Sequence, residues 1–303
     1  MATEKMECAV CRGKEIRPLF IKGEFTFLRC AKCDFQFVHP MPTSGELGFI
    51  YNEGTRAGSN HTINYDLYLR QGDTLKIEFR RILESMSDWG PPGKVLDVGC
   101  AAGFFLRFAR DRGWEVFGSE LSEDLAEYGR KTFGLSIASG DLAMTAYPEA
   151  TFDVVTLIGV IEHLSDPNLV ADELARVTKK GGVLIVLTEN IDTLLPKLLK
   201  QRWNGYMPPE HVCYYSPRSL SVLLERRGFA LKRVWGISSE LRSSLGGLLG
   251  AGRFKSEFKT SLEAKESSHS IIYSGFGHLY RVMNAGFRLF PVHDRMICAF
   301  QRE

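Results

Sequence analysis

The stretch from Lys94 to Phe105, KVLDVGCAAGFF, limits the fold more than any other part of the chain. Its first residues are almost all apolar, as in a strand buried on both faces of a parallel sheet. Asp97 lies near the carboxyl end of this strand, and Gly99 and Gly103 flank a turn into an apolar helical pattern that ends at Gly113. The stretch therefore predicts a strand, a tight turn and a helix within an α/β sheet, with a backbone bare enough for a ligand to approach closely.

This turn does not fit the glycine pattern of dinucleotide-binding loops. That pattern has glycine at the first, third and sixth positions, whereas counting from Gly99 puts Ala101 third and Phe104 sixth. A ligand that carries an amine and a carboxylate could instead use the acid beside the turn. For this stretch taken alone, a strand, turn and helix without any ligand is the alternative.

The acid followed by this glycine turn resembles motif I of the class I S-adenosylmethionine-dependent methyltransferases. Ala101 stands where that family commonly has a middle glycine. Glu120 follows Gly99 by 21 residues, the spacing at which a carboxylate reaches ribose hydroxyls in this topology. The resemblance also implies that Asp141 meets the adenine amine and that Leu142 covers its ring. The residues expected to bind S-adenosylmethionine are Asp97, Gly99, Ala101, Gly103, Glu120, Leu121, Asp141, Leu142 and Gly159.

Downstream of the turn, short apolar strands alternate with helical patterns. Strands are expected at 115–119, 136–139, 152–158, 182–187 and 229–236, and an antiparallel one at 295–300. The helix that begins at Asp166-Pro167 is expected to end at Gly181-Gly182. This order predicts an α/β fold with a Rossmann-like, doubly wound sheet of seven strands, the last of them antiparallel.

Two histidines are candidates for removing a proton from a methyl acceptor. His163 follows Glu162 where the fourth strand ends, at the edge where open α/β sheets bind ligands, and His211 lies on a loop. An imidazole near its ordinary pKa suits proton removal from a hydroxyl or an amine. A structural, hydrogen-bonded role is the alternative for either one. Ubiquinone-type O-methyltransferases look similar here but often have an acid where this chain has Gly159, so no acid-rich metal site is predicted.

Two cysteine pairs near the start of the chain have the spacing of a metal site. Cys8 and Cys11 form one C-x-x-C pair, Cys30 and Cys33 another, and eighteen residues separate the pairs. Two such turns bring four thiolates into the tetrahedral arrangement that suits Zn²⁺, with every ligand position filled by protein as in a structural site. Catalytic zinc and a redox pair are the alternatives, but a redox role explains only one pair. The segment between the pairs predicts a small β-hairpin that the metal would stabilise.

These signals divide the chain into three parts. Residues 1–42 are expected to form the zinc ribbon, 43–93 a helical linker or lid, and 94–303 the methyltransferase domain with a helical insertion at about 240–292. The insertion predicts either a helical hairpin that covers the substrate or forms a homodimer, or an amphipathic surface at 271–290 that touches membrane lipid.

Composition narrows the partners and the compartment. A net charge of +2 weighs against a strongly electrostatic nucleic-acid binder. The first thirty residues contain no apolar run of a secretory signal, and no apolar stretch reaches the roughly 18 residues of a spanning helix. Together with cysteines spaced for metal rather than for disulfides, this predicts a cytoplasmic protein.

The function expected from these features is O-methylation of a small hydroxylated acceptor such as a sugar or a secondary metabolite. Cysteine pairs ahead of such a domain resemble enzymes of bacterial saccharide and secondary-metabolite pathways. A zinc-containing methyltransferase of ribosomal RNA is one alternative, and a non-catalytic binding protein that keeps the cofactor fold is another.

Overall fold

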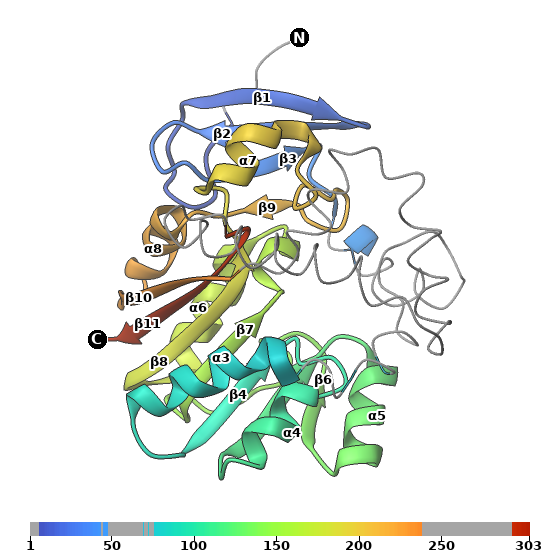
Figure 1. Cartoon of the computed structure of the whole chain (residues 1–303), viewed down its shortest axis with the longest axis vertical. Coiled ribbons are helices and arrows are strands. Elements are labelled where there is room, and N and C mark those ends of the chain that lie inside the picture. Colours follow the sequence, from blue (N-terminus) through green and yellow to red (C-terminus); the bar gives the residue numbers. More distant parts are fainter. Residues whose placement is uncertain (1–5, 44, 48–68, 70–71, 73–75, 238–292) are drawn as a thin grey trace, which may run out of the picture.

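The computed structural model describes residues 6–43, 45–47, 69, 72, 76–237 and 293–303 (Figure 1). The predicted insertion at 240–292, including the suggested membrane contact at 271–290, lies outside these residues. Most of the predicted linker or lid at 43–93 lies outside them as well, apart from its last helix.

A seven-stranded mixed sheet forms the core of the larger part of the molecule (Figure 1). Its strands lie in the order β10-β11-β8-β7-β4-β5-β6. The five strands from β4 to β8 pair in parallel, whereas β11 is antiparallel to both of its neighbours. The predicted sheet with an antiparallel last strand is therefore confirmed. The strands are β4 (Lys94–Val98), β5 (Glu115–Glu120), β6 (Ser136–Ser139), β7 (Phe152–Ile158), β8 (Thr178–Glu189), β10 (Phe229–Ile237) and β11 (Arg295–Arg302).

Both faces of this sheet are covered, which explains why its central strands carry so few polar residues. Along β8, Val183 and Ile185 pack into one hydrophobic core, whereas Leu184 and Val186 pack into the other. Helices α3, α4 and α5 close the first core, and α6 and α8 close the second. The helices are α3 (Lys76–Met86), α4 (Phe104–Arg110), α5 (Glu123–Phe133), α6 (Pro167–Val177), α7 (Leu194–Leu199) and α8 (Pro217–Glu225), with 3-10 turns η1 (Ser87–Trp89), η2 (Ile161–His163) and η3 (Lys200–Arg202).

The predicted end of helix α6 is wrong. The helix begins at Pro167 as expected, but it ends at Val177, and Thr178 is already the first residue of β8. Thr178 pairs with Phe152 and Val183 pairs with Val154, so the glycines between them lie in an irregular segment of the strand. Pairing with β7 therefore overrides the helical pattern at this point.

The cysteine-containing segment forms a second, smaller sheet, drawn in blue at the top of Figure 1. Strands β1 (Ile16–Lys22), β2 (Phe25–Cys30) and β3 (Gln36–His39) follow one another in antiparallel order and include the expected hairpin. The fourth strand, β9 (Cys213–Tyr214), comes from the larger part of the chain and pairs with β3. The boundary predicted at residue 42 thus separates segments that share one sheet.

The ribbon and the large sheet also share a hydrophobic core. Phe27 of the ribbon belongs to the same buried cluster as Leu157 of β7. The Phe27 ring lies 5.4 Å from that of Tyr214, and Phe35 lies 5.1 Å from Tyr215, measured between ring centroids. The ribbon is therefore packed onto one face of the molecule, over the segment that carries β9.

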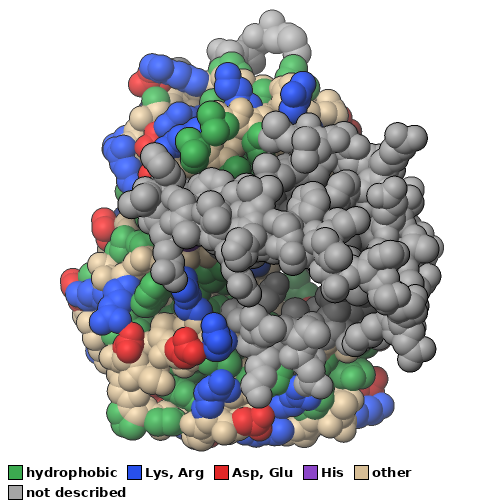
Figure 2. Space-filling model, viewed as in Figure 1, with side chains coloured by type: hydrophobic (Ala, Val, Ile, Leu, Met, Phe, Trp, Pro, Cys, Tyr) green, Lys and Arg blue, Asp and Glu red, His purple; other side chains and the backbone are tan. Residues whose placement is uncertain are grey.

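Basic and acidic side chains are interspersed over the described part of the face in Figure 2. Within the described residues, no helix combines the length and the apolar character needed to cross a membrane.

Candidate functional site

The turn predicted to hold the cofactor lies between β4 and α4. The N–H of Gly99 donates to the carbonyl of Ser119, 2.8 Å away, which ties the turn to the end of β5. Gly99 and Gly103 have φ angles of 71° and 77°, a region that favours glycine. A Cβ at Gly99 would lie 2.6 Å from Val160, and one at Gly103 would lie 2.4 Å from Leu135. Glycine is therefore favoured at both positions, because the backbone has a positive φ and because a side chain would clash with a neighbouring residue.

Ala101 occupies the middle of this turn in a left-handed conformation, with φ of 48°. Such a backbone costs a non-glycine residue on the order of 1 kcal/mol. Its N–H donates to Oε2 of Glu120 at 2.8 Å, and the N–H of Ser122 donates to Oε1 at 2.8 Å. Glu120 thus holds the loops after β4 and β5 together. A carboxylate has about four acceptor positions, so Glu120 can also accept hydrogen bonds from ligand hydroxyls.

Asp97 lies beside this turn and is only 3% exposed. The hydroxyl of Thr156 donates to its Oδ1 at 2.7 Å. Burial raises the pKa of Asp97 to about 7, with the Thr156 hydrogen bond opposing the shift and the Glu120 carboxylate adding to it. Burial also raises the pKa of Glu120. Two carboxyl groups in a poorly solvated place favour a ligand that carries positive charge.

The other predicted cofactor residues follow the neighbouring strands. Asp141 comes after β6 and is exposed, and its Oδ1 accepts the N–H of Met144 at 2.8 Å. Leu121 is 51% exposed, whereas Leu142 is 2% exposed and packs in the core. Gly159 follows β7 with φ of 65°. All of these positions lie at the carboxyl edge of the sheet, and their contacts with a cofactor stay predictions.

A second group of side chains lies at the carboxyl ends of β7 and β8. Both predicted histidines belong to it, because the rings of His163 and His211 meet edge to face with their centroids 4.8 Å apart. Glu162 is 2% exposed and accepts a hydrogen bond from the hydroxyl of Thr188 at 2.8 Å. The structure thus brings a residue from the end of β7 together with one from the loop before β9.

Backbone carbonyls fix the orientation of both imidazoles. Nδ1 of His163 lies 2.7 Å from the carbonyl of Glu210, and Nδ1 of His211 lies 3.2 Å from that of Gly205. A carbonyl can only accept, so each Nδ1 carries the proton and each Nε2 is the accepting nitrogen. Burial lowers the pKa of His211, which keeps this ring neutral at pH 7. With Glu162, the two rings offer ligand atoms within 4.8 Å of one another, a set that could also hold a divalent cation.

Glu189 completes this group and was not among the predicted residues. Its Oε2 lies 3.6 Å from Nδ1 of His211 and has no hydrogen-bond partner among the described residues. Burial raises the pKa of Glu189, and the carboxylate of Glu162 adds to the effect. The strand expected at 182–187 stops short of this residue, whereas β8 continues to it. If the strand had been predicted to continue to residue 189, Glu189 would have been expected at the carboxyl edge of the sheet.

The four predicted metal ligands converge in the ribbon. The Sγ atoms of Cys8 and Cys33 lie 3.6 Å apart, those of Cys11 and Cys30 lie 3.5 Å apart, and all four lie within 4.8 Å of one another. Sulfurs about 2.3 Å from a tetrahedral Zn²⁺ are separated by about 3.8 Å. The spacing of the cysteines therefore fits this ion.

Two matching turns build the cysteine cluster. The N–H of Arg12 donates to the carbonyl of Cys8 at 2.8 Å, and the N–H of Asp34 donates to that of Cys30 at 3.0 Å. Arg12 and Asp34 both have positive φ, 57° and 67°. A Cβ at Gly13 would lie 3.1 Å from a cysteine sulfur, so this glycine leaves room beside the cluster. The repeated geometry is that of two metal-binding turns facing each other.

Solved structures of methyltransferases share this fold. An S-adenosylmethionine-dependent methyltransferase from Archaeoglobus fulgidus superposes with a TM-score of 0.53 at 18% identity, covering 79% of this chain and all of that one. The magnesium protoporphyrin IX methyltransferase of Synechocystis, solved with bound SAH, gives a TM-score of 0.53 at 15% identity over 86% of this chain and all of that one. These likenesses define the class of fold.

The sequence of the chain gives the family. Residues 73–234, a little more than half of the chain, match the model of a methyltransferase domain family. The chain belongs to this family, and the resemblance predicted from the turn after β4 is confirmed.

Relatives of known sequence match this chain over limited lengths. A probable S-adenosylmethionine-dependent methyltransferase of Mycolicibacterium smegmatis is 31% identical over 144 residues, 47% of this chain and 54% of the relative. The 2-methyl-6-phytyl-1,4-hydroquinone methyltransferase of Synechocystis is 35% identical over 126 residues, 38% of this chain and 39% of the relative. A ubiquinone biosynthesis O-methyltransferase of Hydrogenovibrio crunogenus is 26% identical over 201 residues, 62% of this chain and 77% of the relative. The chain spans about half or less of the first two.

Proposed function

We propose that this protein transfers the methyl group of S-adenosylmethionine to a hydroxyl of a small acceptor. The observation that carries the proposal is the carboxyl edge of the sheet, where Asp97 and Glu120 flank the glycine turn and a buried histidine and glutamate group follows β7 and β8. Membership of the methyltransferase domain family supports it. Similarity to O-methyltransferases of ubiquinone biosynthesis favours a hydroxyl as the acceptor.

In this proposal the carboxylates hold the cofactor, which supplies a methyl group on a positively charged sulfonium. Glu120 accepts the ribose hydroxyls while it keeps its two backbone N–H donors. Asp97 provides negative charge for the amino group of the ligand. The turn between Gly99 and Gly103 offers its backbone to the ligand, because glycine carries no side chain.

His211 is the proposed base. With the cofactor bound, its methyl group would pass from the sulfonium sulfur to the acceptor oxygen and leave S-adenosylhomocysteine, while Nε2 of His211 would take up the hydroxyl proton of the acceptor. The Nδ1 proton of His211 is held by the carbonyl of Gly205. Glu189, 3.6 Å from Nδ1, stabilises the imidazolium that results. His163 packs against the ring of His211 and keeps its plane fixed. In this arrangement His163 is a positioning residue, although the sequence alone gave both histidines the same role.

We further infer that Cys8, Cys11, Cys30 and Cys33 hold one structural Zn²⁺. The support is the sulfur spacing and the pair of matching turns. All four positions around the ion would be filled by protein, which leaves none for a catalytic water. The zinc would therefore act on stability rather than on the methyl transfer itself.

Binding of S-adenosylmethionine tests the proposed function. By calorimetry we expect the unaltered chain to bind it and Glu120→Gln to weaken binding roughly tenfold to hundredfold, since one charged hydrogen-bonding group is lost. Glu115→Gln, an exposed change at the other end of the same strand, is the matched control and leaves the affinity unchanged. No binding to the unaltered protein at millimolar ligand would overturn the function, and unchanged affinity in Glu120→Gln would show that the site lies elsewhere.

The raised pKa of Asp97 predicts that binding of the cationic cofactor releases a proton. A nearby positive charge lowers the pKa of a carboxyl, so below about pH 7 the protein must give up the Asp97 proton as the ligand binds. Affinity should therefore rise from about pH 6 to about pH 8 and then level off. Calorimetry at pH 6 in buffers of different ionisation enthalpy counts the released protons. A heat of binding that is the same in every buffer would contradict this coupling.

Without ligand, the same burial makes stability depend on pH. The unfolded Asp97 loses its proton at its ordinary pKa, well below the folded value of about 7. Asp97 therefore contributes a loss of stability that grows as the pH rises through this interval and is complete above about pH 7.

A further inference from the structure

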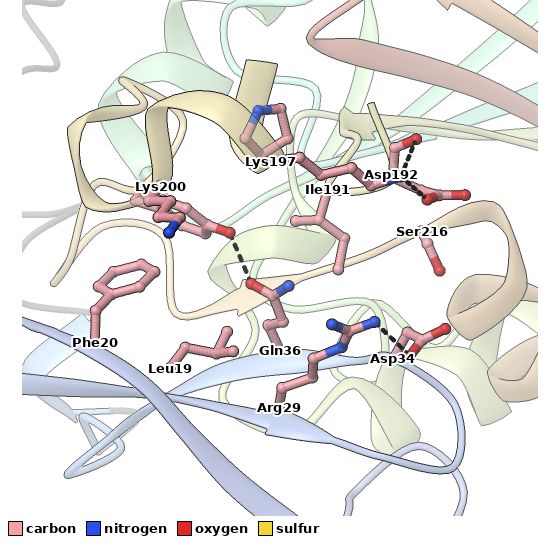
Figure 3. Close-up of a pocket in the computed structure, with 12 residues that line it drawn as sticks. Leu19, Phe20, Arg29, Asp34, Gln36, Ile191, Asp192, Lys197, Lys200 and Ser216 are labelled. Atoms are coloured by element: carbon pink, nitrogen blue, oxygen red, sulfur yellow. Dashed lines mark hydrogen bonds and ion pairs between the residues drawn. The ribbon is translucent and has the colours of Figure 1, made fainter. Parts of the chain in front are cut away.

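A cavity of ≈ 390 Å³ lies between the ribbon and helix α7, and none of the predicted cofactor, metal or catalytic residues lines it (Figure 3). The ribbon contributes Leu19, Phe20, Arg29 and Gln36, and the opposite wall includes Ile191 and Lys200. This volume falls within the range of small-molecule pockets, roughly 300–1,000 Å³.

The lining of the cavity contains three basic residues and two acidic ones. Its two acids are matched, because Asp34 lies 2.8 Å from Arg29 and Asp192 lies 2.6 Å from Lys197. Lys200, the third basic residue of the lining, has no ion pair among the described residues. One ammonium group is thus left for an anion.

Lys200 sits at the end of α7 with a φ of 49°, a conformation that a lysine adopts only at a cost. Lys200 is one of the residues that line the cavity (Figure 3). A basic residue that is held in a strained conformation beside a cavity favours a role in binding over a role in packing.

The ribbon side of the cavity includes an aromatic surface beside the amide of Gln36. The ring of Phe20 stacks on Phe27 with centroids 4.5 Å apart and meets Tyr206 edge to face at 5.0 Å. The hydroxyl of Tyr206 donates to Oε1 of Gln36 at 2.8 Å, which leaves the amide NH₂ of Gln36 as a donor. A ligand here would meet a cation, an amide donor and a flat apolar surface.

We propose that this cavity binds a small organic anion with an aromatic or otherwise apolar body, whose carboxylate or phosphate pairs with Lys200 and whose body lies against Leu19 and Phe20. The assignment does not depend on methyl transfer. It makes the ribbon one wall of a second ligand site in addition to any role of its zinc.

Calorimetry on the chain of 303 residues tests this site with four probes. Benzoate and phenyl phosphate carry both an anion and an apolar body, benzyl alcohol lacks the anion, and inorganic phosphate lacks the body. We expect at least one aromatic anion to bind at least tenfold more tightly than either incomplete probe. The preferred aromatic anion tells whether the site takes a carboxylate or a phosphate.

Substitution of the unpaired cation locates the binding. Lys200→Gln should weaken the aromatic anion about tenfold, a typical effect of removing one charged hydrogen bond. Lys131→Gln, which removes the charge of another exposed lysine, on α5, should leave it unchanged. Melting temperatures of both variants check that each is folded.

Several outcomes would overturn the proposal. They are no binding of either aromatic anion at about 10 mM, equal binding of benzyl alcohol or inorganic phosphate, and an unchanged affinity in Lys200→Gln. The cofactor titration on the same preparation reports on the proposed methyltransferase function separately, so failure of one inference is distinguishable from failure of the other.

Discussion

Replacing His211 with glutamine is expected to lower kcat by between about 10² and 10⁴, the usual effect of removing a general base. Glutamine is close to histidine in size, and its amide can still donate to the carbonyl of Gly205, but it cannot take up a proton. The affinity for S-adenosylmethionine should stay within about twofold, because the proposed cofactor residues, the glycine turn after β4 and Glu120 of β5, belong to other segments of the chain than His211. Single-turnover kinetics with a saturating acceptor measure the chemical step directly.

A pH profile separates a base from a structural histidine. Glu189→Gln removes the negative charge that stabilises the His211 imidazolium, so the pKa of His211 falls and the acidic limb of the kcat profile moves to lower pH. Asp192→Asn, an exposed change just after β8, serves as the control and leaves the limb in place.

Two results would contradict this role of His211. One is a His211→Gln variant that keeps nearly full kcat, which would make the ring structural. The other is a second equivalent of metal in the unaltered protein that is lost in His211→Gln but not in Glu115→Gln, which would make the ring a ligand of a cation bound with Glu162 and His163.

The central sheet could be predicted from the sequence because its strands are buried on both faces. Runs such as the one at 152–158 are mostly apolar, so their composition and the turns around them mark the strands directly. The turn after β4 was equally readable, because Gly99 and Gly103 sit where a side chain would clash. These features depend on local sequence and on burial that local sequence already reports.

Features that depend on pairing between distant segments were not predictable in the same way. Strand β9 has only two residues, Cys213 and Tyr214, too few to show any period, and it exists because β3 offers it an edge. The irregular pairing of β8 around Gly181 hid where this strand begins. Its last residue, Glu189, belongs to the strand because it pairs with Arg295 of β11, which lies far away in the sequence. The contact between His163 and His211 likewise follows from how the loop before β9 returns to the sheet.

Strand β9 leads to the second large effect. It connects the cysteine cluster to the proposed base through β3, and the hydroxyl of Tyr214 donates to the carbonyl of His211 at 2.7 Å. A structural zinc contributes folding free energy outright. Loss of the metal should therefore loosen β3, then β9, and finally the loop that positions His211, although the ribbon contains no residue of the proposed chemistry.

Replacing Cys33 with serine is accordingly expected to remove about one equivalent of zinc, to lower the melting temperature and to reduce kcat at least tenfold, while the affinity for S-adenosylmethionine changes little. The cofactor turn is spared because it packs in the other hydrophobic core with α4 and α5. Cys298→Ser, a buried cysteine of β11 outside the cluster, is the matched control and keeps the zinc. The comparison uses metal analysis, thermal unfolding, titration with S-adenosylmethionine and single-turnover kinetics on each variant. If Cys33→Ser lost its zinc but kept both its melting temperature and its kcat, the ribbon would have to serve something other than support of the acceptor edge.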